Sequence, residues 1–190
     1  MGTRGCGLVR EIGSLIADTA VFVPERARPA GATAGHARAA GGELGPVENE
    51  DYVSCLLRFV SGARGVLEAS RVSVGEQNNY GFEVHGTKGA VFWDFRRMGE
   101  LGVSTGTAYQ DQPVSTVFAG PGQGGYAAFQ PSSATSMGYD DLKVIEAYNF
   151  LRSVAEGTAH GATLDDAVRS ATALDAMLSS AGRGAWVSLA

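Results

Sequence analysis

Hydrophobic and polar residues alternate most clearly between residues 67 and 95, and this pattern predicts three consecutive strands. The strands are residues 67–74, 80–85 and 90–95. The second strand places Phe82 and Val84 on one face and Glu83 and His85 on the other, as a half-buried antiparallel strand requires. A tight turn at Gly86–Gly89 joins it to the third strand, and glycine can adopt the positive φ that a short hairpin loop needs.

Other segments extend this sheet in both directions along the chain. Strand composition, rich in β-branched and aromatic residues, recurs at residues 14–23, 52–60, 64–74, 99–104, 114–119 and 185–189. Short turns join most of these segments, so we expect them to pair as successive hairpins. The pattern predicts a mainly antiparallel sheet of roughly seven strands.

Two helices follow most of the strands. Apolar residues recur at helical spacing from Asp140 to Glu156, with Gly157 as the expected stop, and again from Thr163 to Gly182. In the second helix we expect the inward face to consist of Ala167, Ala171, Leu174, Met177 and Leu178. Helices segregated from strands indicate an α+β fold, with an open, mainly antiparallel β-sheet and helices on one face. The uncovered face implies a partner, most simply a homo-oligomer that forms through the open sheet face.

The length of 190 residues predicts one domain over residues 1–190. Two stretches lack large apolar residues or are rich in glycine, and we expect flexible loops there, at residues 24–50 and 120–138. The last turns of a helix, without its beginning, are predicted around residues 4–12.

Composition excludes several classes of partner. The net charge is −5 without a basic stripe, so we expect no nucleic acid partner. No apolar run approaches ~20 residues, so we expect no membrane span. The first residues lack the apolar core of a signal peptide, and the two cysteines, Cys6 and Cys55, form neither a disulfide framework nor a metal motif. These observations favour a reduced, cytoplasmic setting, with Cys55 as a core residue.

Candidate chemistry is sparse. The segment Gly120–Gly125 (GPGQGG) is similar to a dinucleotide loop, but no helix start follows to hold a pyrophosphate, so we expect no cofactor-binding residues there. The three histidines are far apart in the sequence, which predicts no metal site.

Polar donors gather at the connection that precedes the strand 80–85. Arg71, Asn78 and Asn79 lie beside the aromatic Tyr80. A turn explains the asparagines, and a sugar or polyol site uses the same groups, because hydroxyls need paired donors and acceptors beside a ring face. His85 is a solvated turn residue or, with Glu83 on the same strand face, an acid/base pair.

Three stretches resemble a known family: LLRFVSGARGVLEASRV, NNYGFEVHGTKGAVFWDF and the segment from EAYNFLRSV to RGAWVSL. Together they are similar to the C-terminal domain of the Gfo/Idh/MocA oxidoreductases, and most to inositol 2-dehydrogenase-like members. The resemblance implies NAD or NADP for the complete family enzyme, a small sugar or polyol as substrate, and substrate-binding roles for Arg71, Asn79, Tyr80 and His85.

The chain departs from the family by lacking the N-terminal Rossmann domain. The family's Asp-x-Gly-x-His motif would precede Met1, so we expect no catalytic residues in this chain and no cofactor bound by it alone. One hypothesis is therefore a substrate-binding and oligomerisation half of a truncated or split NAD(P)-dependent oxidoreductase, with a separate Rossmann subunit as a further partner. The alternative is a stand-alone dimeric module that binds a ligand or a protein without redox activity.

Overall fold

The computed structural model describes residues 11–28 and 42–189, and contacts between them divide the chain into two compact units. The first unit holds the described residues up to Val74 and those from Leu164 onward, and the second holds Gly75–Thr163. The expected helical turns at residues 4–12 fall almost entirely outside the described residues. Whether the two units act as one domain stays a prediction.

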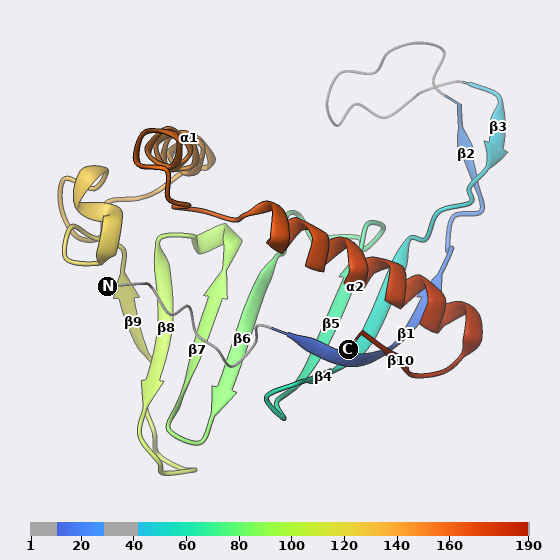
Figure 1. The fold of residues 1–190 in the computed structure, drawn as a ribbon, viewed down its shortest axis with the longest axis horizontal. Coiled ribbons are helices and arrows are strands. Elements are labelled where there is room, and N and C mark those ends of the chain that lie inside the picture. The colour runs from blue at the N-terminus through green and yellow to red at the C-terminus, as the bar shows by residue number, and fades with distance from the viewer. Residues whose placement is uncertain (1–10, 29–41, 190) are drawn as a thin grey trace. The chain divides into compact units, whose positions relative to one another are not determined.

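The first unit is a four-stranded antiparallel sheet with one helix packed on it (Figure 1). The strand order is β10 (Val187–Ser188), β1 (Ile12–Ala20), β4 (Tyr52–Phe59) and β5 (Arg64–Ser70). Helix α2 (Leu164–Arg183) lies across β1. The core between helix and sheet consists of Leu15, Ala17, Cys55, Leu57, Ala176 and Met177. The prediction that Cys55 is a core residue is confirmed, and burial raises the pKa of its thiol.

Alternation along the strands decides which residues enter this core. Leu15 pairs with Leu57 and Ala17 with Cys55, so these residues project to the helix side of the sheet. Leu56 and Val66, which pair with each other, project to the other side and are 52% and 74% exposed. One face of this sheet is therefore open within the first unit.

A two-stranded ribbon interrupts the first unit between β1 and β4. Strands β2 (Glu25–Ala27) and β3 (Leu44–Pro46) pair antiparallel and extend beyond the end of β1 (Figure 1). The sequence predicted only a loop over residues 24–50, because the strands are too short to show alternation. The middle of that loop lies outside the described residues.

The second unit is a separate antiparallel meander. Its strand order is β6 (Gly81–Gly86), β7 (Gly89–Asp94), β8 (Glu100–Thr105) and β9 (Ser115–Phe118). The short 3-10 helices η1 (Phe95–Arg97) and η2 (Gly124–Ala128) and the helix α1 (Tyr139–Glu156) complete it. The expected hairpin turn is confirmed by the pairing of Gly86 with Gly89, which has a φ of 151°.

The α+β class and the antiparallel pairing are confirmed. The strands belong to two four-stranded sheets and one ribbon, instead of the single sheet that the sequence predicts. No strand pairing joins β5 to β6 among the residues described, and the connection between them contains turns with positive φ at Gly75 and Asn78.

The predicted inward face of α2 is largely wrong. The residues that the helix buries are Ala173, Ala176, Met177 and Ser180, whereas Leu174 and Leu178 are 62% and 52% exposed. Small side chains allow the helix backbone to approach the sheet, and Ser180 also forms hydrogen bonds there. Its Oγ accepts from the N–H of Ala17 (3.0 Å) and donates to the carbonyl of Ala185 (2.6 Å). The prediction rested on hydrophobicity alone and therefore placed the larger leucines inward. Met177 is the one residue that is both in the predicted set and buried by α2.

The glycine that ends α1 offers a test of its C-cap conformation. Gly157 has a φ of 63°, the left-handed conformation of a helix C-cap, whereas Gly182 lies within α2 with open space around it. We expect Gly157→Ala to lower the free energy of unfolding by about 1 kcal/mol, because a Cβ disfavours this conformation. Gly182→Ala should raise it by about 0.5 kcal/mol through helix propensity. Urea unfolding of both variants checks this, and equal shifts would contradict it.

Candidate functional site

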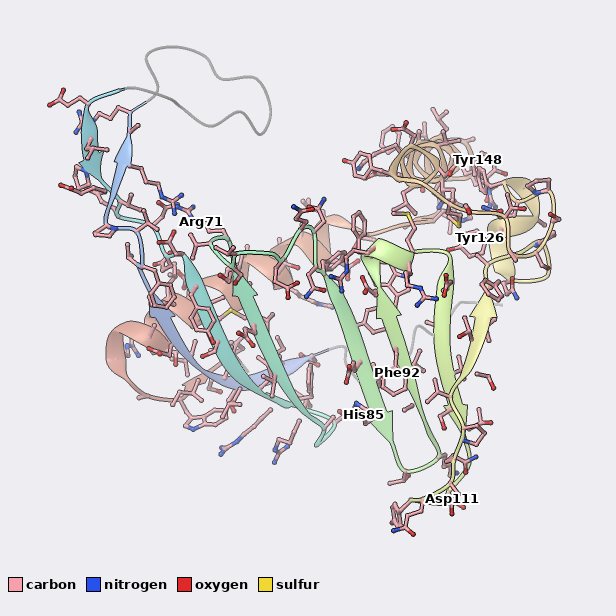
Figure 2. The ribbon with its side chains drawn as sticks, turned by 180° about the vertical axis from the view of Figure 1, so that it is seen from behind. Arg71, His85, Phe92, Asp111, Tyr126 and Tyr148 are labelled. Atoms are coloured by element: carbon pink, nitrogen blue, oxygen red, sulfur yellow. The ribbon has the colours of Figure 1, made fainter. Side chains whose placement is uncertain are left out.

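A hollow of about 380 Å³ lies within the second unit, between η2 and α1. We call it the η2–α1 hollow. Figure 2 shows Tyr126 on η2 and Tyr148 on α1, the two elements that form its walls. Its lining consists of Gly124, Gly125, Tyr126, Ala127, Ala128, Phe129, Ile145, Tyr148, Asn149 and Arg152.

Local backbone geometry positions the η2 wall. The N–H groups of Phe129 and Gln130 both donate to the carbonyl of Tyr126, at 2.9 and 2.8 Å, and this closes the short helix. Gly124 opens it with a φ of 50°, which glycine adopts without strain. The wall therefore presents two aromatic residues, Tyr126 and Phe129, from one compact turn.

Helical spacing positions the α1 wall. Arg152 follows Tyr148 by four positions and Asn149 by three, so its side chain neighbours both of theirs, and all three line the hollow. The rings of Tyr148 and Phe129 meet nearly at a right angle (83°), with centroids 5.1 Å apart. The hollow thus has an aromatic corner flanked by an amide and a guanidinium.

The guanidinium of Arg152 is held in place by its own helix. It lies over the Tyr148 ring, 5.8 Å from the centroid, and forms two hydrogen bonds to Glu156, at 3.0 and 3.2 Å. Glu156 also contacts His160 Nε2 at 2.6 Å. The guanidinium of Arg152, and next His160, hold the pKa of Glu156 below its ordinary value, so the carboxylate compensates the charge of Arg152.

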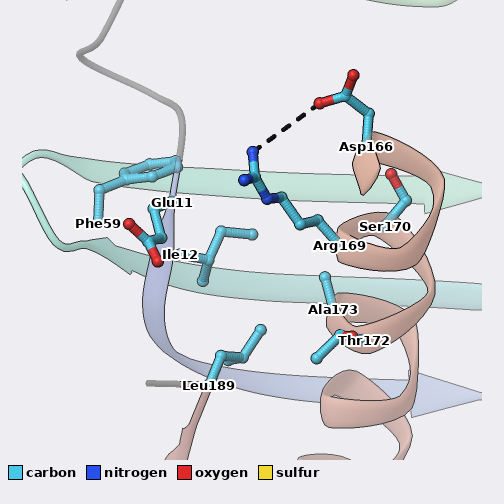
Figure 3. Close-up of a pocket in the computed structure, with 9 residues that line it drawn as sticks. All are labelled: Glu11, Ile12, Phe59, Asp166, Arg169, Ser170, Thr172, Ala173 and Leu189. Carbon is cyan, nitrogen blue, oxygen red and sulfur yellow. Dashed lines mark ion pairs between the residues drawn. The ribbon is translucent and has the colours of Figure 1, made fainter. Parts of the chain in front are cut away.

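A second hollow, of about 460 Å³, lies in the first unit between α2 and the strand ends (Figure 3). Its lining is Glu11, Ile12, Phe59, Asp166, Arg169, Ser170, Thr172, Ala173 and Leu189. Asp166 and Arg169 form an ion pair at 4.0 Å. Phe59 is the one aromatic residue in this lining, so the hollow offers less ring surface for a ligand than the η2–α1 hollow does.

Arg71 lies at the end of β5, where it contacts a buried carboxylate. Its Nε donates to Asp51 Oδ1 at 2.9 Å, and its Nη2 donates to Asn49 Oδ1 at 3.4 Å. Asp51 is 2% exposed and also binds the guanidinium of Arg26. The structure therefore gives Arg71 a structural contact that the sequence did not indicate, and its substrate role stays a prediction.

Asn79 and Tyr80 lie in the second unit, at the start of β6. Tyr80 is 62% exposed, and its ring centroid lies 5.4 Å from that of Trp93 and 5.5 Å from that of Phe95. The preceding Asn78 has a φ of 49°, which supports the turn interpretation for that residue. Asn79 thus directly precedes a residue of a partly exposed aromatic cluster, and its binding role stays a prediction.

His85 and Glu83 lie on the same face of β6, as the alternation predicts. Nε2 of His85 is 3.1 Å from Oε2 of Glu83, and both side chains are about two-thirds exposed. The imidazole meets the edge of the Phe92 ring, 5.4 Å between centroids. The pair is an open surface contact of the second unit, whereas Arg71 belongs to the first unit.

Within the described residues, three or more His, Cys, Asp or Glu side chains nowhere gather in a way that could hold a metal ion. Among the same residues, helices long and apolar enough to cross a membrane are absent.

Sequence reasoning missed the η2–α1 hollow. It interpreted residues 120–138 as a flexible loop and the apolar residues of α1 as packing positions. The available signal was weak, because Tyr126 and Phe129 follow the glycine-rich segment Gly120–Gly125 whereas Tyr148 and Arg152 come about 20 positions later, and composition alone does not bring them into contact.

The chain is similar in sequence to a known domain family and to a dehydrogenase. Residues 2–92 match the family model described as the GFO/IDH/MocA C-terminal domain. The levoglucosan dehydrogenase of Pseudarthrobacter phenanthrenivorans is 33% identical over 183 residues, which cover 95% of this chain and 47% of that enzyme.

Solved structures give the same result. A levoglucosan dehydrogenase in complex with NADH and L-sorbose has a TM-score of 0.83 at 32% identity, and the match covers 95% of this chain and 46% of that one. An NAD binding oxidoreductase from Klebsiella pneumoniae has a TM-score of 0.81 at 29% identity, over 95% and 46% of the two chains.

The chain therefore has an α+β fold that is similar to part of these oxidoreductases. Over residues 2–92 the chain is similar to the C-terminal domain of the GFO/IDH/MocA family, and over 95% of its length it is similar to a levoglucosan dehydrogenase. It spans about half the length of the relatives that it matches.

Proposed function

We propose that this chain forms the sugar-binding half of an NAD(H)-dependent sugar oxidoreductase. The observation that carries the proposal is the match over 95% of the chain to a levoglucosan dehydrogenase whose structure contains both NADH and a sugar. Because the matched relatives are named for levoglucosan, we favour a cyclic sugar over the inositol that the sequence suggested.

The described residues do not fit a dinucleotide. Gly120–Gly125 leads into the five-residue 3-10 helix η2, whereas pyrophosphate binding uses the N-terminus of an α-helix after a parallel strand. The strand pairs in the described part of the chain are antiparallel. In our proposal the nicotinamide cofactor binds to a nucleotide-binding half outside these residues, and this chain binds and orients the sugar.

The open face of the first sheet supports a homo-oligomer. Leu56 and Val66 are exposed side by side on the face opposite α2. Burial of such residues against a second copy would remove apolar surface from water. We therefore retain association through this face as part of the proposal.

The test is complementation with the nucleotide-binding half of the P. phenanthrenivorans enzyme. We expect the mixture to reduce NAD when levoglucosan is added, measured by absorbance of NADH at saturating cofactor. In this mixture Asn79→Ala should lower kcat/KM about 10-fold, because an amide supplies one or two hydrogen bonds to sugar hydroxyls. Gln77→Ala, in the same exposed turn, is the matched control.

An Asn79→Ala variant with unchanged kcat/KM would remove Asn79 from the site. Sugar binding without turnover would favour the alternative of a stand-alone binding module. The compact core of the first unit supports that second candidate, because a buried cluster of its own allows the chain to fold by itself.

A further inference from the structure

We propose that the η2–α1 hollow binds the ring of a neutral saccharide, with the aromatic corner as its platform and Asn149 and Arg152 as its hydrogen-bonding groups. This inference rests on the proposed function and adds to it a second sugar position, in a hollow whose lining does not include Asn79. The hollow lies wholly within the second unit and therefore needs no assumption about the other unit.

The shape of the hollow suits a sugar ring. Its volume of about 380 Å³ is within the range of small-molecule sites. A pyranose has one face of C–H groups that packs on an aromatic ring, while its hydroxyls point outward to polar groups. Phe129 and Tyr148 meet at 83°, so a ring that packs on one of them has its edge against the other.

The polar groups match hydroxyls in number and kind. The Asn149 side chain offers both a donor and an acceptor, as each hydroxyl requires. Arg152 offers its remaining N–H groups as donors, and its two bonds to Glu156 fix their direction before a ligand arrives. A group that is already oriented loses less conformational entropy when a ligand binds.

Because Glu156 compensates the charge of Arg152, the hollow favours a neutral ligand. Nε and Nη2 of Arg152 already donate to Glu156, and this carboxylate would repel a ligand carboxylate or phosphate. Asn149 and the aromatic residues carry no charge. The hollow should therefore discriminate against an acidic sugar of the same size.

The experiment measures binding to the full chain without a partner. Levoglucosan, L-sorbose and glucuronate are titrated separately, and dissociation constants are obtained from saturation-transfer NMR and calorimetry. We expect the two neutral sugars to bind and glucuronate to bind at least 10-fold more weakly. Tyr148→Ala and Asn149→Ala should each weaken levoglucosan binding about 10-fold or more.

Tyr109→Ala is the matched control, because Tyr109 is fully exposed in the same unit and does not line the hollow. Its dissociation constant should equal that of the wild type. Circular dichroism of each variant separates a loss of binding from a loss of folding. A folded Tyr148→Phe variant that retains affinity would further support the role of the ring.

Three outcomes overturn the inference. Binding of a neutral sugar that is unchanged in folded Tyr148→Ala and Asn149→Ala variants places the sugar elsewhere. Absence of any sugar binding by the chain removes the site, and stronger binding of glucuronate contradicts the charge argument. The proposed function stands or falls separately, on turnover in the complemented enzyme.

Discussion

Replacing Asp51 with alanine is expected to lower the melting temperature of this chain by about 10 °C, since removal of a buried carboxylate leaves several hydrogen-bond donors without their acceptor. Asp51 Oδ2 accepts hydrogen bonds from the N–H groups of Phe22 (3.0 Å) and Val23 (2.8 Å). Its Oδ1 binds the guanidinium groups of Arg26 and Arg71. Removal of the carboxylate therefore leaves two backbone donors and two cations without their acceptor.

The consequence extends to the arrangement of four segments. Asp51 joins the end of β1, the ribbon strand β2, the start of β4 and the residue that follows β5. Its own N–H donates to the carbonyl of Ala20, and its carbonyl accepts from the N–H of Arg71. We expect Asp51→Ala to loosen the β2–β3 ribbon first, which hydrogen exchange of Arg28 and Val47 amides would detect.

Because the charged form of Asp51 stabilises the fold, we expect the stability of the chain to depend on pH. The N–H of Val23, followed by Arg71, Arg26 and the N–H of Phe22, lowers the pKa of Asp51, and this outweighs the opposing effect of burial. Because the folded-state pKa lies below the unfolded value of about 3.9, the contribution is complete above that value. It is lost as the pH falls through the folded-state pKa.

Thermal unfolding of wild type and Asp51→Asn at several pH values between about 7 and 3 checks this expectation. The difference between the two proteins should be largest at neutral pH and shrink at the acid end. Asp18→Asn, on an exposed position of β1, is the control and should change the melting temperature little. An Asp51→Asn variant as stable as the wild type at neutral pH would contradict the role assigned to the carboxylate.

Replacing Leu15 with alanine is expected to lower the free energy of unfolding by about 3 kcal/mol. Leu15 is fully buried in β1 and belongs to the cluster with Leu57, Ala176 and Met177. Its truncation removes three carbon atoms from the contact between the sheet and α2 and leaves a cavity there. Urea unfolding monitored by circular dichroism measures the change, with an unchanged m-value expected.

Leu56→Ala is the matched control on the opposite face of the same sheet. Leu56 is 52% exposed, so its truncation should cost less than about 1 kcal/mol in the dilute chain. If the open face forms the proposed oligomer, sedimentation of Leu56→Ala should show a weaker association than that of the wild type. Equal costs for both leucines would show that the sheet is covered on both sides.

Much of the fold could be predicted from local sequence. Alternation located strands from Tyr52 to Phe118 within a few residues, since the period of two is fixed by backbone geometry and does not depend on the rest of the protein. The end of α1 at Gly157 was also predictable, because glycine is the residue that tolerates the left-handed conformation found there. The short ribbon strands at Glu25 and Leu44 were not, since three residues show no period.

The candidate site was less predictable. Sequence reasoning grouped Arg71, Asn79 and Tyr80 because they are neighbours along the chain. The structure gives Arg71 to the first unit and the other two to the second. The residues of the η2–α1 hollow are separated by up to 28 positions, from Gly124 to Arg152, so their meeting is not visible in any local pattern.

By itself, the sequence determined the α+β class, the antiparallel pairing and most element boundaries, because propensity, alternation and turn chemistry act over a few residues. Only the tertiary structure decided which face of α2 is buried. Ser180 lies on that face because its small side chain packs closely and forms hydrogen bonds to Ala17 and Ala185. The tertiary structure also decided that Asp51 is a buried junction, since four segments distant in sequence must converge before one carboxylate can bind them all.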